Sequence, residues 1–310
     1  MKIKMLLFLA FMFAAVSASA GPAAGAALKK EMRTTPSGRE YVCGLSEETM
    51  RHQGLLRKFF LYMPENLGDG APLIVVLHGY GGKADPERYD FSRIADRYGV
   101  AVCYPQGEKN GIGKTGWNVG YDSQKDMKTD DVDFVCSLAR HLQKKYGLSR
   151  RNTFCTGFSN GGDICYQIAF ERPEVFAALA PVGGLTFEWV YRTKSAKRPV
   201  AICEIHGTAD KVSMWNGDSE NTGGWGRYIA VEQAVGYWAA ANRCTHVITE
   251  EVAPRDPQKS RRTLLHRYVG GTDGKEVWLY EIIGGKHSWG DKDIDTTAEI
   301  WRFFSNYLSE

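Results

Sequence analysis

The sequence of 310 residues has no block of like charges that would form a basic arm or an acidic tail. Its 39 Lys and Arg residues nearly balance its 36 Asp and Glu residues, so the formal net charge is only +3. This balance argues against nucleic acid as a partner. The 43% hydrophobic and 24% charged residues match a globular protein and exclude a disordered or collagen-like chain.

Cysteine pairs with the spacing of a metal or redox site are also missing. The seven cysteines include no C-x-x-C pair, which argues against a zinc site or a dithiol redox motif. Cys103, Cys155 and Cys203 lie within apolar runs and are expected to be buried thiols. Cys43 and Cys244 are better placed for a disulfide, although the sequence does not fix any pairing.

A long apolar run that could span a membrane is absent after residue 20. Residues 1–20 begin with Lys2 and Lys4, continue through the apolar run 5–16, and end in small residues. This pattern is typical of a secretory signal peptide, and the run is shorter than the roughly 20 residues that a bilayer span needs. We predict cleavage after Ala20, export, and a mature protein that is not held in a membrane.

Strands and helices are expected to alternate along the rest of the chain. A flexible stretch at 21–37 precedes one predicted domain at 38–310. Apolar runs and amphipathic spacing predict strands over 57–63, 72–77, 100–104, 153–156, 176–182, 200–205 and 276–283, and helices over 89–98, 130–146, 161–170, 231–241 and 297–308. The alternation indicates a mostly parallel central sheet with helices on both faces. Two long loops, 106–129 and 211–228, are rich in Gly and carry Trp, as binding loops often do.

The clearest motif is GFSNG at residues 157–161, between a predicted strand and a predicted helix. A G-x-S-x-G segment in this position makes a sharp turn that lifts the serine hydroxyl above the sheet. Gly157 and Gly161 leave room for the strained backbone of Ser159. We therefore predict that Ser159 is a nucleophile, which needs a base and a carboxylate to activate it.

The two partners of Ser159 are expected in the chain order serine, acid, histidine. His287 lies in GGKHSWG, directly after the last predicted strand. Asp210 lies in HGTAD, directly after the strand predicted at 200–205, whereas Asp218 and Asp295 are weaker candidates. We predict Ser159, Asp210 and His287 as a catalytic triad.

Ester cleavage also needs hydrogen-bond donors for the oxygen that becomes negative. One donor is expected to be the backbone amide of Asn160, which follows the nucleophile. The other is expected in LHGYGG at 77–82, where the amide of Tyr80 is the best candidate. We expect His78 to shape this loop by hydrogen bonding and not to act as a base.

Aromatic side chains in the loops are candidate substrate contacts. Trp117, Trp215, Trp225 and Trp289 all fall in loops expected around Ser159. Aromatic faces suit sugar rings and planar phenolic acids. We expect two of these four to contact substrate, with Trp117, Trp215 and Trp289 as the predicted substrate-binding candidates.

Three acidic residues, Asp130, Asp131 and Asp133, stand close together in the sequence. They could suggest a metal site, but acidic residues are also favoured at the start of a helix. We expect a capped helix start and no metal.

Four segments of the sequence resemble those of one esterase family. They are LHGYGG at 77–82, YPQG at 104–107, GFSNGG followed by ERP, and HGTAD together with GGKHSW. They are similar to secreted esterases of carbohydrate esterase family 1, which includes polyhydroxybutyrate depolymerase-like enzymes and bacterial feruloyl and acetylxylan esterases. The resemblance implies an α/β-hydrolase fold, no cofactor, and Ser159, Asp210 and His287 as the triad.

These observations together predict a secreted serine esterase that removes feruloyl groups, or acetyl groups as second choice, from a plant polysaccharide such as xylan. A polyester depolymerase and a non-catalytic polysaccharide-binding protein remain as alternatives. A peptidase is possible on the same fold, but about fifty residues separate Ser159 from Asp210 and leave little room for a large cap domain.

Overall fold

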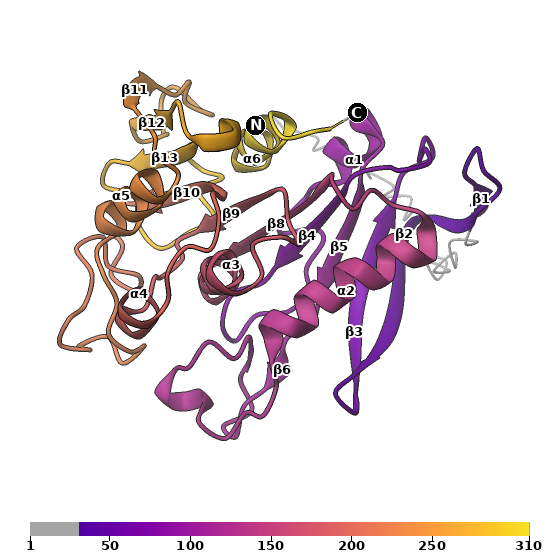
Figure 1. The fold of residues 1–310 in the computed structure, drawn as a ribbon, viewed down its shortest axis with the longest axis horizontal. Helices are drawn as coiled ribbons and strands as arrows, with labels where there is room; N and C mark the ends of the chain where they lie inside the picture. Colours follow the sequence, from indigo (N-terminus) through magenta and orange to yellow (C-terminus); the bar gives the residue numbers. More distant parts are fainter. Residues whose placement is uncertain (1–30, 310) are drawn as a thin grey trace, which may run out of the picture.

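The structure is a computed structural model that describes residues 31–309, so the predicted signal peptide at 1–20 and residues 21–30 lie outside the described part. One sheet of eleven strands runs through the molecule in the order β1-β2-β3-β5-β4-β8-β9-β10-β13-β12-β11 (Figure 1). The strands are β1 (Glu31–Thr34), β2 (Glu40–His52), β3 (Leu55–Met63), β4 (Leu73–Leu77), β5 (Ala101–Pro105), β8 (Thr153–Phe158), β9 (Ala178–Val182), β10 (Ala201–Gly207), β11 (His246–Glu251), β12 (Thr263–Val269) and β13 (Val277–Ile282). A separate hairpin joins β6 (Glu108–Lys109) to β7 (Thr115–Gly116).

The centre of this sheet is parallel and its two edges are antiparallel. Strands β5, β4, β8, β9, β10 and β13 pair in parallel, while β1, β2 and β3 on one side and β12 and β11 on the other pair antiparallel. The central strands are buried along their whole length, as expected for strands that helices cover on both faces. Their carboxyl ends lie at the same edge of the sheet, which is where the site is built.

Six helices cover the sheet in the described part of the chain. They are α1 (Ser92–Tyr98), α2 (Asp131–Tyr146), α3 (Asn160–Glu171), α4 (Glu188–Thr193), α5 (Val231–Ala241) and α6 (Thr296–Ser305). The apolar side chains of α2, α3 and α5 pack with Leu73, Val75 and Leu77 of β4 on one face. Those of α1 and α6 pack with the alternate residues Ile74 and Val76 on the other face (Figure 1). Successive side chains of β4 therefore point into two separate hydrophobic cores, one on each face of the sheet.

The predicted strands and helices are present, with ends shifted by a few residues, and Asp130 caps α2 by accepting a hydrogen bond from the Asp133 amide. The flexible stretch predicted at 21–37 is wrong in part, because β1 lies within it and pairs with β2. Strands β2, β11 and β12 and helix α4 were not predicted. Five of the six side chains of β11 are exposed, so this edge strand lacks the apolar pattern from which strands are predicted.

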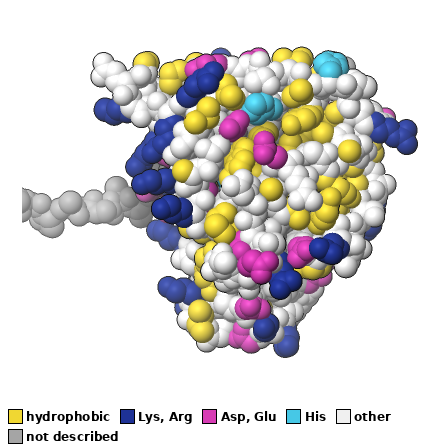
Figure 2. All heavy atoms as spheres, turned by 90° about the vertical axis from the view of Figure 1, so that its left-hand side faces the viewer, with side chains coloured by type: hydrophobic (Ala, Val, Ile, Leu, Met, Phe, Trp, Pro, Cys, Tyr) yellow, Lys and Arg dark blue, Asp and Glu magenta, His cyan; other side chains and the backbone are white. Residues whose placement is uncertain are grey.

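Figure 2 shows the side of the molecule that lies at the left of Figure 1, where hydrophobic side chains form separate groups between charges of both signs.

Cys103, Cys155 and Cys203 are buried, as predicted, and all seven cysteines are free. The disulfide considered for Cys43 and Cys244 is therefore absent from the structure, in which they lie near opposite edges of the sheet. No helix within residues 31–309 is long and apolar enough to cross a membrane.

Candidate active site

A sharp turn between β8 and α3 places Ser159 at the carboxyl edge of the sheet. Its backbone has φ 55° and ψ −120°, a strained combination for a residue with a side chain. The turn is held by the Ser159 amide, which donates to the Val182 carbonyl at 2.8 Å. A Cβ atom at Gly157 would lie 2.4 Å from the Gly161 carbonyl oxygen, so only glycine fits there. The geometry is the one that the GFSNG motif predicts.

The structure brings Ser159, His287 and Asp210 together from three separate loops. The Ser159 hydroxyl lies 3.0 Å from His287 Nε2, and His287 Nδ1 lies 2.7 Å from Asp210 Oδ2. Because a carboxylate only accepts hydrogen bonds, Nδ1 carries the ring proton and leaves Nε2 free to accept the serine proton. The arrangement is that of a nucleophile, a base and an orienting acid.

Asp210 is held by the loop that follows β10. Its Oδ1 atom accepts hydrogen bonds from the amides of Val212 at 2.7 Å and Ser213 at 2.9 Å. The side chain is only 2% exposed, whereas the side chain of His287 is 18% exposed. The two amides fix one oxygen of the carboxylate, so the other oxygen is directed at His287.

The weaker acidic candidates lie elsewhere and have other roles. Asp218 accepts hydrogen bonds from the amides of Thr222 and Gly223 and so stabilises its own loop. Asp295 caps α6 through the Ala298 amide and pairs with Arg93.

The two residues whose amides are predicted to bind the oxyanion lie next to Ser159 in different ways. Asn160 follows Ser159 as the first residue of α3, and Tyr80 lies in the loop after β4 and lines the pocket at Ser159. Within residues 31–309, neither amide donates a hydrogen bond to a protein acceptor. An amide without a protein acceptor is available to bind the negative oxygen of a tetrahedral intermediate.

His78 fixes the loop that carries Tyr80. Its Nδ1 atom donates to the Gly79 carbonyl at 2.8 Å, and its Nε2 atom accepts from the Gly107 amide at 2.9 Å. Burial lowers the pKa of His78 to about 4, so the ring is neutral near pH 7 and can accept at Nε2. This arrangement agrees with a structural role for His78.

Trp117 anchors a second loop beneath the pocket. Its amide donates to Asn160 Oδ1 at 2.7 Å, and its ring nitrogen donates to the His78 carbonyl at 2.7 Å. The side chain is fully buried, so the prediction that Trp117 contacts substrate is wrong. What separates it from a surface Trp is its contact with the Asn160 side chain, 43 residues further along the chain, which no local sequence pattern indicates.

The open pocket at Ser159 has a volume of about 250 Å³. Its lining includes Ser159 and His287, the aromatic residues Tyr80, Tyr89, Tyr121, Phe158 and Trp225, and the basic residue Arg88. Of the four loop tryptophans, only Trp225 lines this pocket. Trp289 is 4% exposed and packs on Tyr89, and Trp215 packs edge-on against His206, so neither lines it. The prediction of these two as substrate contacts is therefore not supported, and Tyr121 and Arg88 were missed.

A buried carboxyl group is hydrogen-bonded to Tyr121, one of the aromatic residues that line the pocket. Asp163 of α3 is fully buried and accepts hydrogen bonds from the Tyr121 hydroxyl at 2.5 Å and the Leu185 amide at 2.7 Å. Burial raises the pKa of Asp163 to about 7, and these two hydrogen bonds oppose the increase. Asp163 thus ties two pocket residues, Tyr121 and Leu185, to the helix that begins at the serine.

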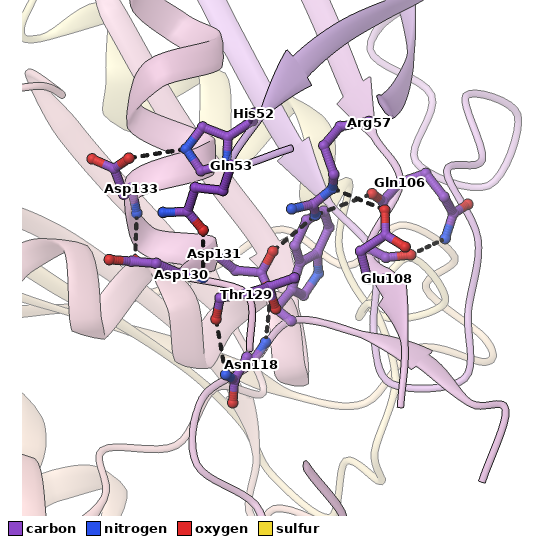
Figure 3. Close-up of polar contacts among 12 residues, drawn as sticks. His52, Gln53, Arg57, Gln106, Glu108, Asn118, Thr129, Asp130, Asp131 and Asp133 are labelled. Carbon is purple, nitrogen blue, oxygen red and sulfur yellow. Dashed lines mark hydrogen bonds and ion pairs between the residues drawn. The ribbon is translucent and has the colours of Figure 1, made fainter. Parts of the chain in front are cut away.

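A buried ion pair holds the start of α2 and the long loop before it (Figure 3). The Arg57 guanidinium lies 2.8 Å from Asp131 and 3.1 Å from Glu108, over the ring of Phe134. The second oxygen of Asp131 accepts from the Asn118 amide at 2.8 Å. The acids at this helix start are therefore used by a cap and by ion pairs. No cluster of residues that could hold a metal ion occurs within the described chain.

Residues 57–219 match the family described as esterase PHB depolymerase. The bifunctional acetylxylan esterase/xylanase XynS20E of Neocallimastix patriciarum is 30% identical over 261 residues, which cover 83% of this chain and 34% of that protein. Feruloyl esterase B of Piromyces equi is 27% identical over 243 residues, which cover 76% of this chain and 43% of that protein. The chain thus spans less than half the length of either relative.

Solved structures agree with the fold. An acetyl xylan esterase from Aspergillus awamori superposes with a TM-score of 0.56 at 16% identity, covering 84% of this chain and 99% of that one. A carboxylesterase of Bacillus cereus gives a TM-score of 0.52 at 13% identity, covering 81% and 95%. The prediction of an α/β-hydrolase fold is confirmed. Between Ser159 and Asp210 the chain forms α3, β9, α4 and β10, with no inserted cap domain.

Proposed function

The chain belongs to the esterase PHB depolymerase family, and from this premise we propose that it is a serine carboxylic-ester hydrolase acting on feruloyl or acetyl esters of a plant polysaccharide such as xylan. The observation that carries the proposal is the contact of the Ser159 hydroxyl with His287 Nε2 at 3.0 Å, with Asp210 behind His287 at 2.7 Å. The family match supports ester hydrolysis, and the two relatives named as acetylxylan and feruloyl esterases support the substrate class.

In this mechanism Ser159 attacks the ester carbonyl while His287 takes its proton. The developing negative oxygen is bound by the amides of Tyr80 and Asn160. His287 then donates the proton to the leaving sugar hydroxyl, and Asp210 holds the ring in the required tautomer. A water molecule that His287 activates finally releases the acid from Ser159.

The lining of the pocket favours a feruloyl group over an acetyl group. Tyr80, Tyr121 and Trp225 form an aromatic wall, with ring centroids of Tyr80 and Tyr121 lying 5.6 and 5.2 Å from that of Trp225. A planar phenolic ring gains more from such a wall than a methyl group does. Phe158 and Arg88 lie on the side of His287, since the Phe158 ring is 4.8 Å from the His287 ring and the Arg88 guanidinium is 5.5 Å from the Phe158 ring. His287 protonates the leaving group, so we place the sugar on this side and the acyl group at the aromatic wall.

The test is hydrolysis of methyl ferulate, acetylated xylan and hydroxybutyrate polymer by the purified protein and by Ser159→Ala. We expect release of ferulate, less acetate, and no release by the variant, because the nucleophile is lost. A Ser159→Ala protein that keeps near parental rates would refute the mechanism.

The family description itself favours a second candidate, a polyester depolymerase. Release of hydroxybutyrate alone would establish that candidate in place of the first. We also infer that the protein is exported, on the basis of the signal-like segment 1–20. Sequencing the amino terminus of the secreted protein tests this inference, with Gly21 expected as the first residue.

A further inference from the structure

A second pair of ionisable residues lies behind Asp210, on the strand that leads to it. Glu204 and His206 are alternate residues of β10 and therefore point to the same face of the sheet. Their exposures are 0% and 1%, so both are removed from water. Burying ionisable groups is costly unless they are paired, and the proposed ester hydrolysis does not by itself require them.

The contacts of His206 fix where its protons lie. Nε2 is 2.7 Å from the Ser213 carbonyl oxygen, and because a carbonyl only accepts, Nε2 must carry a proton. Nδ1 is 2.8 Å from Glu204 Oε1, which also accepts from the Gly184 amide at 3.3 Å. Although burial opposes the charge, the hydrogen bond and the charge of Glu204 raise the pKa of His206. Burial also raises the pKa of Glu204, and its hydrogen bond to His206 opposes that increase. Because Glu204 Oε1 also accepts from the Gly184 amide, we assign the shared proton to His206 Nδ1, which makes the ring an imidazolium.

This pair reaches Asp210 by two routes. His206 Nε2 lies 3.7 Å from Asp210 Oδ2, the same oxygen that accepts from His287. In addition, the backbone of Ser213 joins the two residues. Its carbonyl accepts from His206, and its amide donates to Asp210 Oδ1 at 2.9 Å. His206 therefore holds the loop that holds Asp210, and its charge faces the carboxylate.

We propose that Glu204 and His206 are a positioning pair, in which the His206 imidazolium and the Ser213 backbone hold Asp210 directed at His287. The proposal rests on the proposed serine-esterase function. Because His206 holds the Ser213 carbonyl and faces Asp210 Oδ2, loss of its charge should let the carboxylate turn away from His287. The ionisable groups that face this pair are Asp210 and His287 from the loops after β10 and β13, and Asp163 and Tyr166 from α3.

Two variants test the charge without removing the side-chain volume. Glu204→Gln removes the carboxylate that keeps His206 charged, and His206→Gln keeps a donor for the Ser213 carbonyl but removes the charge. In both variants we expect kcat on 4-nitrophenyl acetate to fall by roughly tenfold, because Asp210 no longer holds His287 in place. We expect KM to change by less than twofold, because neither Glu204 nor His206 lines the pocket.

The matched control is Asn242→Ala, which loosens the other end of the same strand. Asn242 is fully buried and exchanges two hydrogen bonds with the backbone of Val200, just before β10. It should lower the thermal stability and leave kcat within twofold of the parent. A kcat that falls equally in Asn242→Ala, or that stays within twofold of the parent in both glutamine variants, would overturn the proposal.

A second measurement does not depend on the folding of these variants. In the Ser159→Ala protein, the imidazole ¹⁵N resonances of His206 should be those of a doubly protonated ring at pH 7. Resonances of a neutral ring at pH 7 would contradict the charged pair. An absence of esterase activity in the parent protein would instead refute the proposed function, so the two failures are distinguishable.

Discussion

Replacing Asp163 by Asn should change how the stability of the protein depends on pH. In the folded protein the pKa of this buried carboxyl is raised to about 7, from an ordinary value of 3.8 in the unfolded chain. Between these two values the folded state binds a proton that the unfolded state does not. The stability that protonated Asp163 contributes is therefore fully present below about pH 4 and is lost as the pH rises through about 7.

The size of this effect follows from the shift. One pKa unit corresponds to about 1.4 kcal/mol, so the free energy of unfolding should fall by about 3 kcal/mol between pH 5 and pH 7.5 through this group. In Asp163→Asn, Oδ1 can still accept from the Leu185 amide, and Nδ2 can donate to the Tyr121 hydroxyl oxygen. The variant should thus keep the fold and lose the pH dependence of this group.

Urea unfolding at pH 5 and at pH 7.5, measured on the parent and on the variant, provides the assay. The stability of the variant relative to the parent should be higher at pH 7.5 than at pH 5 by about 3 kcal/mol. Glu232→Gln is the control, because Glu232 is an exposed residue of α5 and should leave the parental pH dependence unchanged. A difference between Asp163→Asn and the parent that does not vary with pH would refute the reasoning.

Two further predictions concern the pocket wall and the buried ion pair. In steady-state assays, Trp225→Ala should raise KM for methyl ferulate by roughly tenfold and leave kcat/KM for 4-nitrophenyl acetate within twofold, because only the larger acyl group reaches the aromatic wall. The control Trp189→Ala replaces an exposed Trp outside the pocket and should change neither quantity. Arg57→Met should cost about 3 to 5 kcal/mol of stability by urea unfolding, because it leaves the carboxylate of Asp131 buried without its cation. Adding Asp131→Leu to Arg57→Met should restore part of that loss, and no recovery would contradict the buried-charge explanation.

A site residue can be predicted from the sequence when a short motif marks it, and not when its place depends on contacts with distant residues. Ser159, Asp210 and His287 each follow a buried strand within a short motif, so their meeting at one edge of a parallel sheet is predictable. Trp117 and Trp225 occupy similar Gly-rich loops, yet one is buried and the other lines the pocket. What separates them are contacts between residues far apart in the sequence, and a single sequence gives no indication of these contacts.

The strands follow the same logic. Central strands such as β4 and β9 are apolar along their whole length and were predicted, because helices cover both of their faces. Strand β11 is held by backbone hydrogen bonds to β12 at the sheet edge and exposes nearly all of its side chains. Backbone hydrogen bonds do not require any particular order of side-chain types, so strands of this kind are not predicted from an apolar pattern.

The division of the pocket between sheet and loops has a consequence for how such enzymes diversify. The serine, acid and base are placed by strand ends, whereas Tyr80, Tyr121 and Trp225 come from three different loops. Each of these loops is fixed at points outside the wall, for example where Trp117 is bound by Asn160. Substitutions in the wall can therefore accumulate without moving the reacting atoms. The acyl preference is then the property expected to differ first between close homologues, and the first that directed evolution could exchange.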